Sequence, residues 1–179
     1  MHHTTEASEW IRRWTALVPD KGSVMDVACG FGRHMRWFHQ RQHAVVGVDR
    51  SPEAVAAAAH WGHAVEADIE AGPWPFLDKT EPLPKVQRYD AVVVCNYLWR
   101  PLLPILVESV KPGGVLLYET FAAGNGSVGR PSRPDFLLQP GELLQVCEGF
   151  KIVAYEDVYL IDPPRFVQRI AAYRLQNVT

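Results

Sequence analysis

The sequence predicts an α/β fold built on one doubly wound sheet that is mostly parallel and has an antiparallel end. In residues 24–34, an apolar run, a glycine turn and a stretch with helical spacing follow one another, as in a strand–turn–helix unit. Strand-like and helix-like segments then alternate twice up to residue 68, which indicates parallel strands joined by helices. Near the C-terminal end, two strand-like segments flank a short turn, so they must pair antiparallel.

The first expected element is an amphipathic helix over residues 6–18, because Trp10, Trp14, Leu17 and Val18 share one face of such a helix. Two interpretations of this helix stay open. It packs on the edge of the domain, as apolar stripes usually do, or it covers a ligand site near the glycine turn. We assign residues 1–21 as an N-terminal covering segment of a single domain over residues 1–179.

The other elements follow from apolar runs and the residues that interrupt them. Ser51 and Pro52 match an N-cap and a first helical position. Several prolines disfavour a long helix in residues 71–88, so this stretch is expected to be irregular. After the first strand, we expect strands over 44–49, 64–67, 90–95, 115–121, 151–159 and 166–175, helices over 33–41, 53–60, 102–110 and 141–147, and a loop over 122–139.

Composition and charge exclude several classes of protein for this chain. A chain of 179 residues with 47% hydrophobic residues and a net charge of −2 fits one globular domain without a basic face for nucleic acid or anionic membrane. No apolar run is long enough for a membrane helix. Cys29, Cys95 and Cys147 form an odd set without metal spacing, which indicates a reduced, cytoplasmic setting. His60 and His63 have metal-like spacing but lack a third ligand, so no metal is expected.

The expected strand ends carry the polar residues of a ligand site. Ligands of open parallel sheets bind beyond the carboxyl ends of the strands. Asp49 follows Gly30 by 19 residues, a spacing that suits a carboxylate accepting hydrogen bonds from the ribose hydroxyls of an adenosine. Two kinds of cofactor compete here. NAD requires the pattern G-x-G-x-x-G/A, and this chain carries Met35 where the third small residue should stand.

Together these motifs resemble the class I S-adenosylmethionine-dependent methyltransferases. The stretch DVACGFG from Asp26 to Gly32 is similar to their first motif, acid-x-G-x-G-x-G, with Ala28 as a sterically mild departure at the first glycine. Asp49 and Asp68 match the acidic residues at the ends of their second and third strands. The resemblance covers residues 22–121, and the stretches NYLWRPLLP and GRPSRPDFLLQPGELL are most similar to small bacterial members of the tellurite-resistance-type group.

The resemblance implies a Rossmann-like sheet in the order 3-2-1-4-5-7-6 and a site for S-adenosyl-L-methionine. In that site the glycine turn would admit the methionine part, Asp49 would bind the ribose, and Asp68 would accept from the adenine amino group. The cofactor-binding residues implied in this way are Asp26, Ala28, Cys29, Gly30, Gly32, Asp49, Asp68, Ile69, Cys95 and Asn96.

Acceptors bind after the fourth strand in this family. The residues expected to contribute are Tyr97 and Arg100 as catalytic residues, and Trp99, Arg130 and Arg133 as substrate-binding residues. The alternative is that the residues after the strand pack against the next helix and that the two later arginines belong to a solvated loop. His34 has two interpretations as well, a general base or a polar residue at a helix start.

The sequence therefore predicts methyl transfer from S-adenosyl-L-methionine to a small molecule or metalloid oxyanion by in-line displacement. An NAD-dependent oxidoreductase and a non-catalytic, S-adenosylmethionine-binding regulatory module remain as alternatives. Cys95-Asn96-Tyr97-Leu98 lacks the prolines of the DNA adenine-methylase tetrapeptide, so nucleic acid is not an expected partner. We expect a monomer or a homodimer with no membrane partner.

Overall fold

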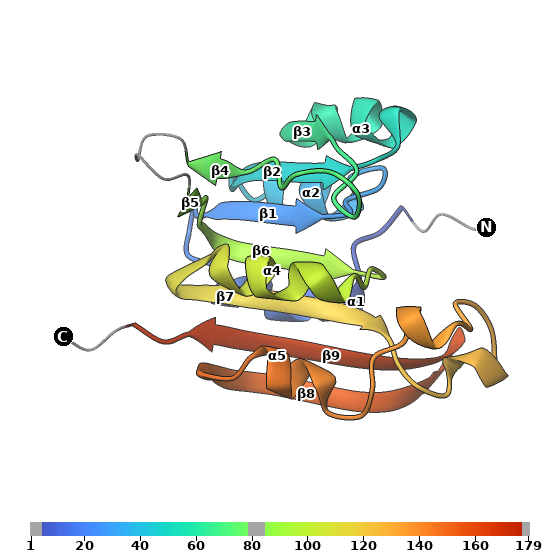
Figure 1. Cartoon of the computed structure of the whole chain (residues 1–179). Helices are drawn as coiled ribbons and strands as arrows, with labels where there is room; N and C mark the ends of the chain where they lie inside the picture. The colour runs from blue at the N-terminus through green and yellow to red at the C-terminus, as the bar shows by residue number, and fades with distance from the viewer. Residues whose placement is uncertain (1–4, 79–84, 177–179) are drawn as a thin grey trace.

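A computed structural model of the chain describes residues 5–78 and 85–176. Seven strands form one sheet in the order β3-β2-β1-β6-β7-β9-β8, and β4 and β5 form a separate antiparallel pair (Figure 1). The strands from β3 to β7 in this order are parallel, whereas β9 is antiparallel to both β7 and β8. The predicted doubly wound sheet, mostly parallel with an antiparallel end, is confirmed.

The observed strand order differs in detail from the predicted one. The prediction counted seven strands and lacked the hairpin of β4 (Leu77–Asp78) and β5 (Lys85–Val86), which changes the numbering of every later strand. Each of these strands has two residues, too few for a period to be visible in the sequence. Residues 79–84, within the stretch predicted to be irregular, lie outside the described residues. The strands of the large sheet are β1 (Ser23–Val27), β2 (Ala44–Asp49), β3 (His63–Glu66), β6 (Tyr89–Cys95), β7 (Val110–Phe121), β8 (Phe150–Ile161) and β9 (Pro164–Arg174).

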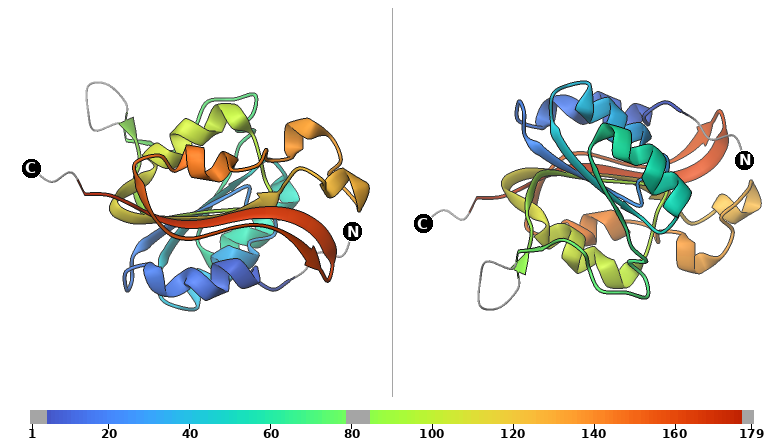
Figure 2. Two further views of the ribbon diagram at one scale, coloured as in Figure 1. Left: turned by 90° about the horizontal axis from the view of Figure 1, so that it is seen from below. Right: turned by 90° about the horizontal axis from the view of Figure 1, so that it is seen from above.

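Helices cover both faces of the sheet, as the two views in Figure 2 show. One face carries α1 (Glu9–Trp14), α2 (Arg33–His39) and α3 (Pro52–Ala58), and the other carries α4 (Leu103–Glu108) and α5 (Glu142–Val146). Short 3₁₀ turns complete the described chain: η1 (Thr15–Leu17), η2 (Ala59–Trp61), η3 (Arg100–Leu102), η4 (Asn125–Ser127) and η5 (Pro134–Phe136).

Local capping decides where two of the helices begin. Ser51 Oγ accepts from the Ala54 N–H at 3.3 Å, and Pro52 stands at the first helical position of α3, as predicted. α1 is shorter than the predicted helix over residues 6–18. Its first residue is Glu9 because Ser8 caps it, with Ser8 Oγ accepting from the Trp10 N–H at 3.2 Å, and after Trp14 the chain tightens into η1.

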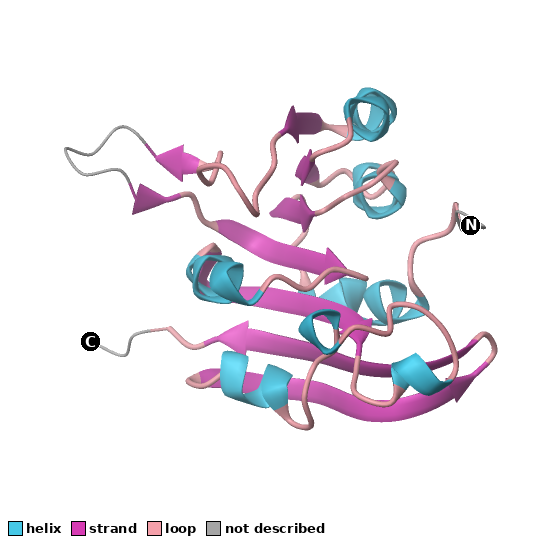
Figure 3. Ribbon diagram, turned by 45° about the vertical axis from the view of Figure 1, so that its right-hand side comes forward, coloured by secondary structure: helices cyan, strands magenta, loops and turns pink. Residues whose placement is uncertain are grey.

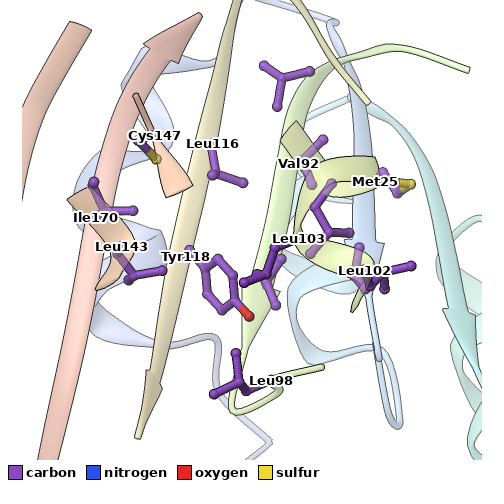
Figure 4. Close-up of a cluster of buried hydrophobic side chains, with 14 of the residues drawn as sticks. Met25, Val92, Leu98, Leu102, Leu103, Leu116, Tyr118, Leu143, Cys147 and Ile170 are labelled. Carbon is purple, nitrogen blue, oxygen red and sulfur yellow. The ribbon is translucent and has the colours of Figure 1, made fainter. Parts of the chain in front are cut away.

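The hydrophobic core lies on both faces of the sheet, because successive side chains of a strand point to opposite sides. Figure 4 shows the face beneath α4 and α5, where Met25, Val92 and Leu116 of three neighbouring strands pack with Leu103 and Leu143 of the two helices. A second cluster fills the face beneath α1, α2 and α3 and includes Trp10, Met35 and Phe38. Because helices cover both faces of the sheet, we expect a ligand to bind at the ends of the strands.

The parallel strands all end at the same edge of the sheet, where loops gather (Figure 3). The residues that follow β1, β2, β3 and β6 therefore come together although they are far apart in the sequence. Within the described residues, no helix is long and apolar enough to cross a membrane.

Candidate functional site

The turn between β1 and α2 forms the floor of the site. Ala28, Gly30 and Gly32 all have left-handed backbone conformations, with φ of 52°, 52° and 77°. A Cβ on Gly32 would lie 2.9 Å from the Ala58 Cα, so only glycine fits there. A Cβ on Gly30 would meet nothing within 4 Å, so this glycine faces open space at the strand ends.

Ala28 has the backbone geometry of the glycine that it replaces in the motif. A left-handed conformation costs a residue with a Cβ about 1–2 kcal/mol. The expectation of a mild departure from the motif is therefore wrong for the backbone, because the turn keeps the glycine geometry and the alanine is strained.

Asp49 joins the end of β2 to this turn. One carboxylate oxygen accepts from the Gly30 N–H at 2.8 Å, and the other accepts from the Ser51 N–H at 3.0 Å. Each oxygen can accept a second hydrogen bond. Asp49 is thus held in place by the backbone while it keeps acceptor capacity for a ligand.

Two cavities meet at Ala28 and Asp49. The larger, of about 500 Å³, is lined by most of the predicted cofactor residues, namely Ala28, Cys29, Gly30, Gly32, Asp49, Cys95 and Asn96, together with Thr5, Phe31, Arg33, His34, Arg36, Ser51, Ala54 and Trp61. The smaller, of about 220 Å³, is lined by Ala28, Asp49, Arg50, Ala67, Asp68, Ile69, Glu70 and Tyr97. The carboxylate of Asp49 therefore borders both a larger compartment and a smaller one with a more apolar lining.

Asp26 is buried within the apolar strand β1, as predicted, and it is not among the residues that line the larger cavity. It is 1% exposed, and its Oδ2 has no hydrogen-bond partner among the described residues. Burial raises the pKa of Asp26 to about 7, although Arg33 and the Met35 N–H act in the opposite direction. A buried carboxyl with an unused oxygen is costly, so this group favours a proton or a nearby cation.

His34 is a contact of Asp26 that the sequence left undecided. Its Nδ1 lies 3.8 Å from Asp26 Oδ1, and its Nε2 accepts from the Ser8 N–H at 3.2 Å. Burial, and then the charge of Arg33, lower the pKa of His34 to about 3. Burial therefore favours the neutral imidazole, and the hydrogen bond from Ser8 together with the contact to Asp26 favours the interpretation of His34 as a polar residue at a helix start.

The two cavity cysteines are inert thiols. Burial raises the pKa of Cys95 to about 12, and burial raises the pKa of Cys29 as well. Cys95 Sγ accepts from Arg33 at 3.1 Å and donates to Glu119 Oε1 at 3.7 Å. Both residues help to shape the cavity, and neither has the lowered pKa of a nucleophilic cysteine.

The predicted acceptor residues do not gather around one cavity. Tyr97 lines the smaller cavity beside Asp68 and Ile69, so its position suits the cofactor side and not the methyl acceptor. Trp99 packs, half-buried, against the core. These positions depend on the turn after β6, where the Tyr97 carbonyl accepts from the Tyr118 hydroxyl at 2.8 Å.

Arg100 stabilises the fold at the place where a catalytic residue was expected. Its guanidinium forms two hydrogen bonds of 2.7 and 2.9 Å with the Glu142 carboxylate and donates to the carbonyls of Asp135 and Leu137 at 2.9 Å each. This arrangement joins η3 to η5 and α5. Among the described residues, neither Arg100, Arg130 nor Arg133 lines the two cavities, and Arg133 instead pairs with Asp135 at 2.8 Å.

Sequence reasoning missed Ser8, Glu119 and Arg36. Thr5, Glu6 and Ser8 precede α1 and reach the cavity through hydrogen bonds with Arg36, Arg33, His34 and Glu119. These contacts join segments up to 111 residues apart, so no local pattern could reveal them. The helix itself packs on the domain, with Trp10 and Ile11 buried in the core, whereas Thr5, which precedes the helix, lines the larger cavity.

A doubly wound sheet with a glycine turn and an acidic residue at adjoining strand ends defines a nucleotide-binding class of α/β protein. Residues 24–114 match the family described as a methyltransferase domain, which is about half of the chain. The chain belongs to this family.

One curated relative and several solved structures resemble the chain. The Bacillus subtilis (strain 168) protein named "Putative methyltransferase YqeM" is 27% identical over 126 residues, which cover 64% of this chain and 49% of that protein. The chain thus spans about half the length of this relative. TehB from Haemophilus influenzae superposes with a TM-score of 0.73 at 16% identity, over 97% of this chain and 64% of that one. A SAM-dependent methyltransferase from Methanosarcina mazei superposes with a TM-score of 0.70 at 14% identity, over 96% of this chain and 100% of that one. At these identities the structures show a shared fold.

Proposed function

We propose that this chain is a single methyltransferase domain that transfers a methyl group from S-adenosyl-L-methionine to a small-molecule acceptor. The observation that carries the proposal is the pair of cavities that meet at Asp49, whose carboxylate is fixed by the Gly30 and Ser51 N–H groups. A carboxylate between two compartments suits a ribose that has a base on one side and an aliphatic chain on the other.

The residues present fit this cofactor in three respects. Gly30 opens onto the larger cavity, and the space that a Cβ would take has no neighbour within 4 Å, which suits close approach of a ligand to the backbone. Asp68 and Ile69 line the smaller cavity, where a carboxylate and an apolar side chain suit an amino-purine ring. Asp26 has an unpartnered buried oxygen beneath the larger cavity, which suits the positive charge of the methionine part.

The cofactor, when bound, supplies a methyl group on a sulfonium that a nucleophile can displace in line. The chain's own residues then have to orient the two reactants and exclude water, because positioning supplies most of the acceleration in such a reaction. Asp49 and Asp68 hold the adenosine by hydrogen bonds, and the turn from Ala28 to Gly32 fixes the other end. Asn96 and Cys95 line the larger cavity at the end of β6.

We infer that the acceptor is a nucleophile that needs no proton removed by the protein. His34 has its acceptor nitrogen occupied by Ser8, and burial raises the pKa of both cavity thiols. Arg33 and Arg36 line the larger cavity, which favours an acceptor with an anionic group. Arg100, Arg130 and Arg133 lie outside the lining of both cavities, so an acceptor bound in either cavity would not contact them directly.

The NAD-dependent alternative has less support. Met35 is fully buried between α2 and the sheet, and a Cβ on Gly47 would overlap its sulfur, so Gly47 in β2 makes the space for this side chain. The position that must be small in a dinucleotide-binding turn is thus occupied by a large residue with its own matching space in β2.

Calorimetric titration with S-adenosylmethionine, S-adenosylhomocysteine and NAD tests the proposal. We expect micromolar binding of the first two compounds and none of NAD. A panel of anionic acceptors, with formation of S-adenosylhomocysteine as the measured product, then tests for turnover. Binding without turnover on any acceptor would favour the regulatory module, and binding of NAD alone would favour the oxidoreductase.

A further inference from the structure

The hydroxyl and the backbone N–H of Ser8 both form hydrogen bonds at the start of α1. Its Oγ accepts from the Trp10 N–H at 3.2 Å, which caps α1, and the same hydroxyl donates to Glu119 Oε1 at 2.7 Å. Its backbone N–H donates to His34 Nε2 at 3.2 Å. One residue therefore ties the start of α1 to the start of α2 and to the end of β7.

Both partners of Ser8 lead to groups in or beneath the larger cavity. His34 lines the cavity and lies 3.8 Å from the buried carboxyl of Asp26. Glu119 is 5% exposed and accepts from the Cys95 thiol, which also lines the cavity. A displacement of Ser8 would therefore affect two residues that line the same cavity, His34 directly and Cys95 through Glu119.

Glu119 is a firm anchor because its charge is paired. Its Oε2 accepts from Arg169 at 3.2 Å, and Arg169 in turn donates to the Glu156 carboxylate at 2.7 Å through Nε. The Arg169 guanidinium also lies 4.9 Å from the centre of the Trp10 ring. Glu119 therefore contacts the cap of α1 through Ser8, and its partner Arg169 contacts α1 itself through Trp10.

The residues just before Ser8 form part of the cavity wall. Arg36 donates to the Thr5 carbonyl at 2.7 Å, and Arg33 reaches the Glu6 carbonyl at 3.4 Å. Thr5 itself lines the larger cavity. The chain enters α1 from the edge of the sheet where β6 and β7 end (Figure 1), so the segment that contributes Thr5 to the cavity wall leads directly to the Ser8 cap of α1.

We propose that Ser8 is a positioning residue for the cofactor cavity, through which docking of α1 and occupancy of the cavity stabilise each other. The proposal rests on the proposed function, because it takes the adenosyl cofactor as the occupant. Any ligand that binds better to the docked form must strengthen docking by the same factor, since coupling between two equilibria is reciprocal.

The test combines calorimetry with S-adenosylhomocysteine and hydrogen exchange of the α1 amides. In the unaltered chain, the ligand should slow exchange in residues 9–14 by about fivefold or more. Ser8→Ala removes the cap and the bond to Glu119 but keeps the backbone N–H, and it should weaken ligand affinity about tenfold, within the usual range of coupling between sites. Ser8→Thr restores the hydroxyl and should return affinity to within about threefold of the original.

Thr15→Val is the matched control. Thr15 also joins the α1 region to α2, since its hydroxyl accepts from Trp37 Nε1 at 2.8 Å and donates to the Ile11 carbonyl at 2.8 Å, yet it lies outside both cavities. This variant should lower thermal stability and leave ligand affinity within about twofold. Equal weakening by Thr15→Val and Ser8→Ala would reduce Ser8 to a general stability residue and overturn the proposal.

Two further outcomes separate this inference from the proposed function. If the unaltered chain binds S-adenosylhomocysteine and Ser8→Ala binds it equally well, the positioning role of Ser8 is lost while the methyltransferase assignment stands. If the unaltered chain does not bind the compound, both proposals fail together.

Discussion

The Asp49 carboxylate accepts a 2.8 Å hydrogen bond from the backbone N–H of Gly30, so the end of β2 and the turn after β1 form one unit. The second oxygen is fixed by Ser51 at 3.0 Å. A ligand bound by Asp49 is therefore held at a set distance from the glycine turn, and this geometry underlies the first prediction.

Asp49→Ala should weaken binding of S-adenosylhomocysteine by about 100-fold or more, because hydrogen bonds to a charged group contribute roughly 1.5–3 kcal/mol each. Calorimetric titration measures the effect. Asp157→Ala, which removes an exposed carboxylate on β8, a strand separated from β2 by four other strands of the sheet, should leave affinity unchanged. Unaltered affinity in Asp49→Ala would remove the basis of the proposed function.

Ala28→Gly should raise the free energy of unfolding by up to about 1 kcal/mol, since it relieves a left-handed alanine. Denaturant unfolding measures this change. The same substitution at Ala56, on the exposed side of α3, should lower stability by about 1 kcal/mol because glycine disfavours a helix. The two variants carry the same chemical change, but they should change the free energy of unfolding in opposite directions. Loss of stability in both would contradict the presence of backbone strain at Ala28.

Arg100→Ala should lower the free energy of unfolding by about 1–2 kcal/mol, because it removes a partly exposed bidentate ion pair and two bonds to backbone carbonyls. Affinity for S-adenosylhomocysteine should not change. Arg133→Ala is the matched control: its ion pair with Asp135 is 71% and 69% exposed, so its loss should have almost no effect on stability. A loss of cofactor affinity in Arg100→Ala would return this residue to the site.

Asp26→Asn should stabilise the unliganded chain at high pH and not at low pH. The pKa of Asp26 is about 7 in the folded chain against an ordinary 3.8, so folding favours the protonated form. The resulting stability is complete below about pH 4 and is lost as the pH rises through 7. Thermal unfolding of both chains from pH 4 to 8 measures the difference in their stability. Because His34 is present in both chains, the contribution of its titration largely cancels in this difference.

The advantage of Asp26→Asn over the unaltered chain should therefore grow with pH, by on the order of 4 kcal/mol at most. A difference that is constant with pH would show that Asp26 keeps an ordinary pKa. A difference that shrinks as the pH rises would mean that the carboxylate is stabilised by a partner in the folded chain.

The fold class and the position of the site along the chain follow from local patterns in the sequence. The alternation of strands and helices predicts the parallel sheet because the connections are short and local. The spacing of Gly30 and Asp49 predicts their proximity, since both residues follow strands that end at the same edge. Each of these inferences depends on neighbouring residues and on rules that hold for every parallel sheet.

The side chains that line the cavity depend on contacts between residues far apart in the sequence, which local patterns do not predict. Arg100 pairs with Glu142, 42 residues away, Ser8 bonds with Glu119, 111 residues away, and the buried Asp26 contacts His34 of α2. The physical reason is that a side chain selects its partner by distance and charge in three dimensions. A sequence pattern predicts where a segment lies in the sheet. A long or charged side chain of that segment can reach several partners, and the pattern does not predict which of them it contacts.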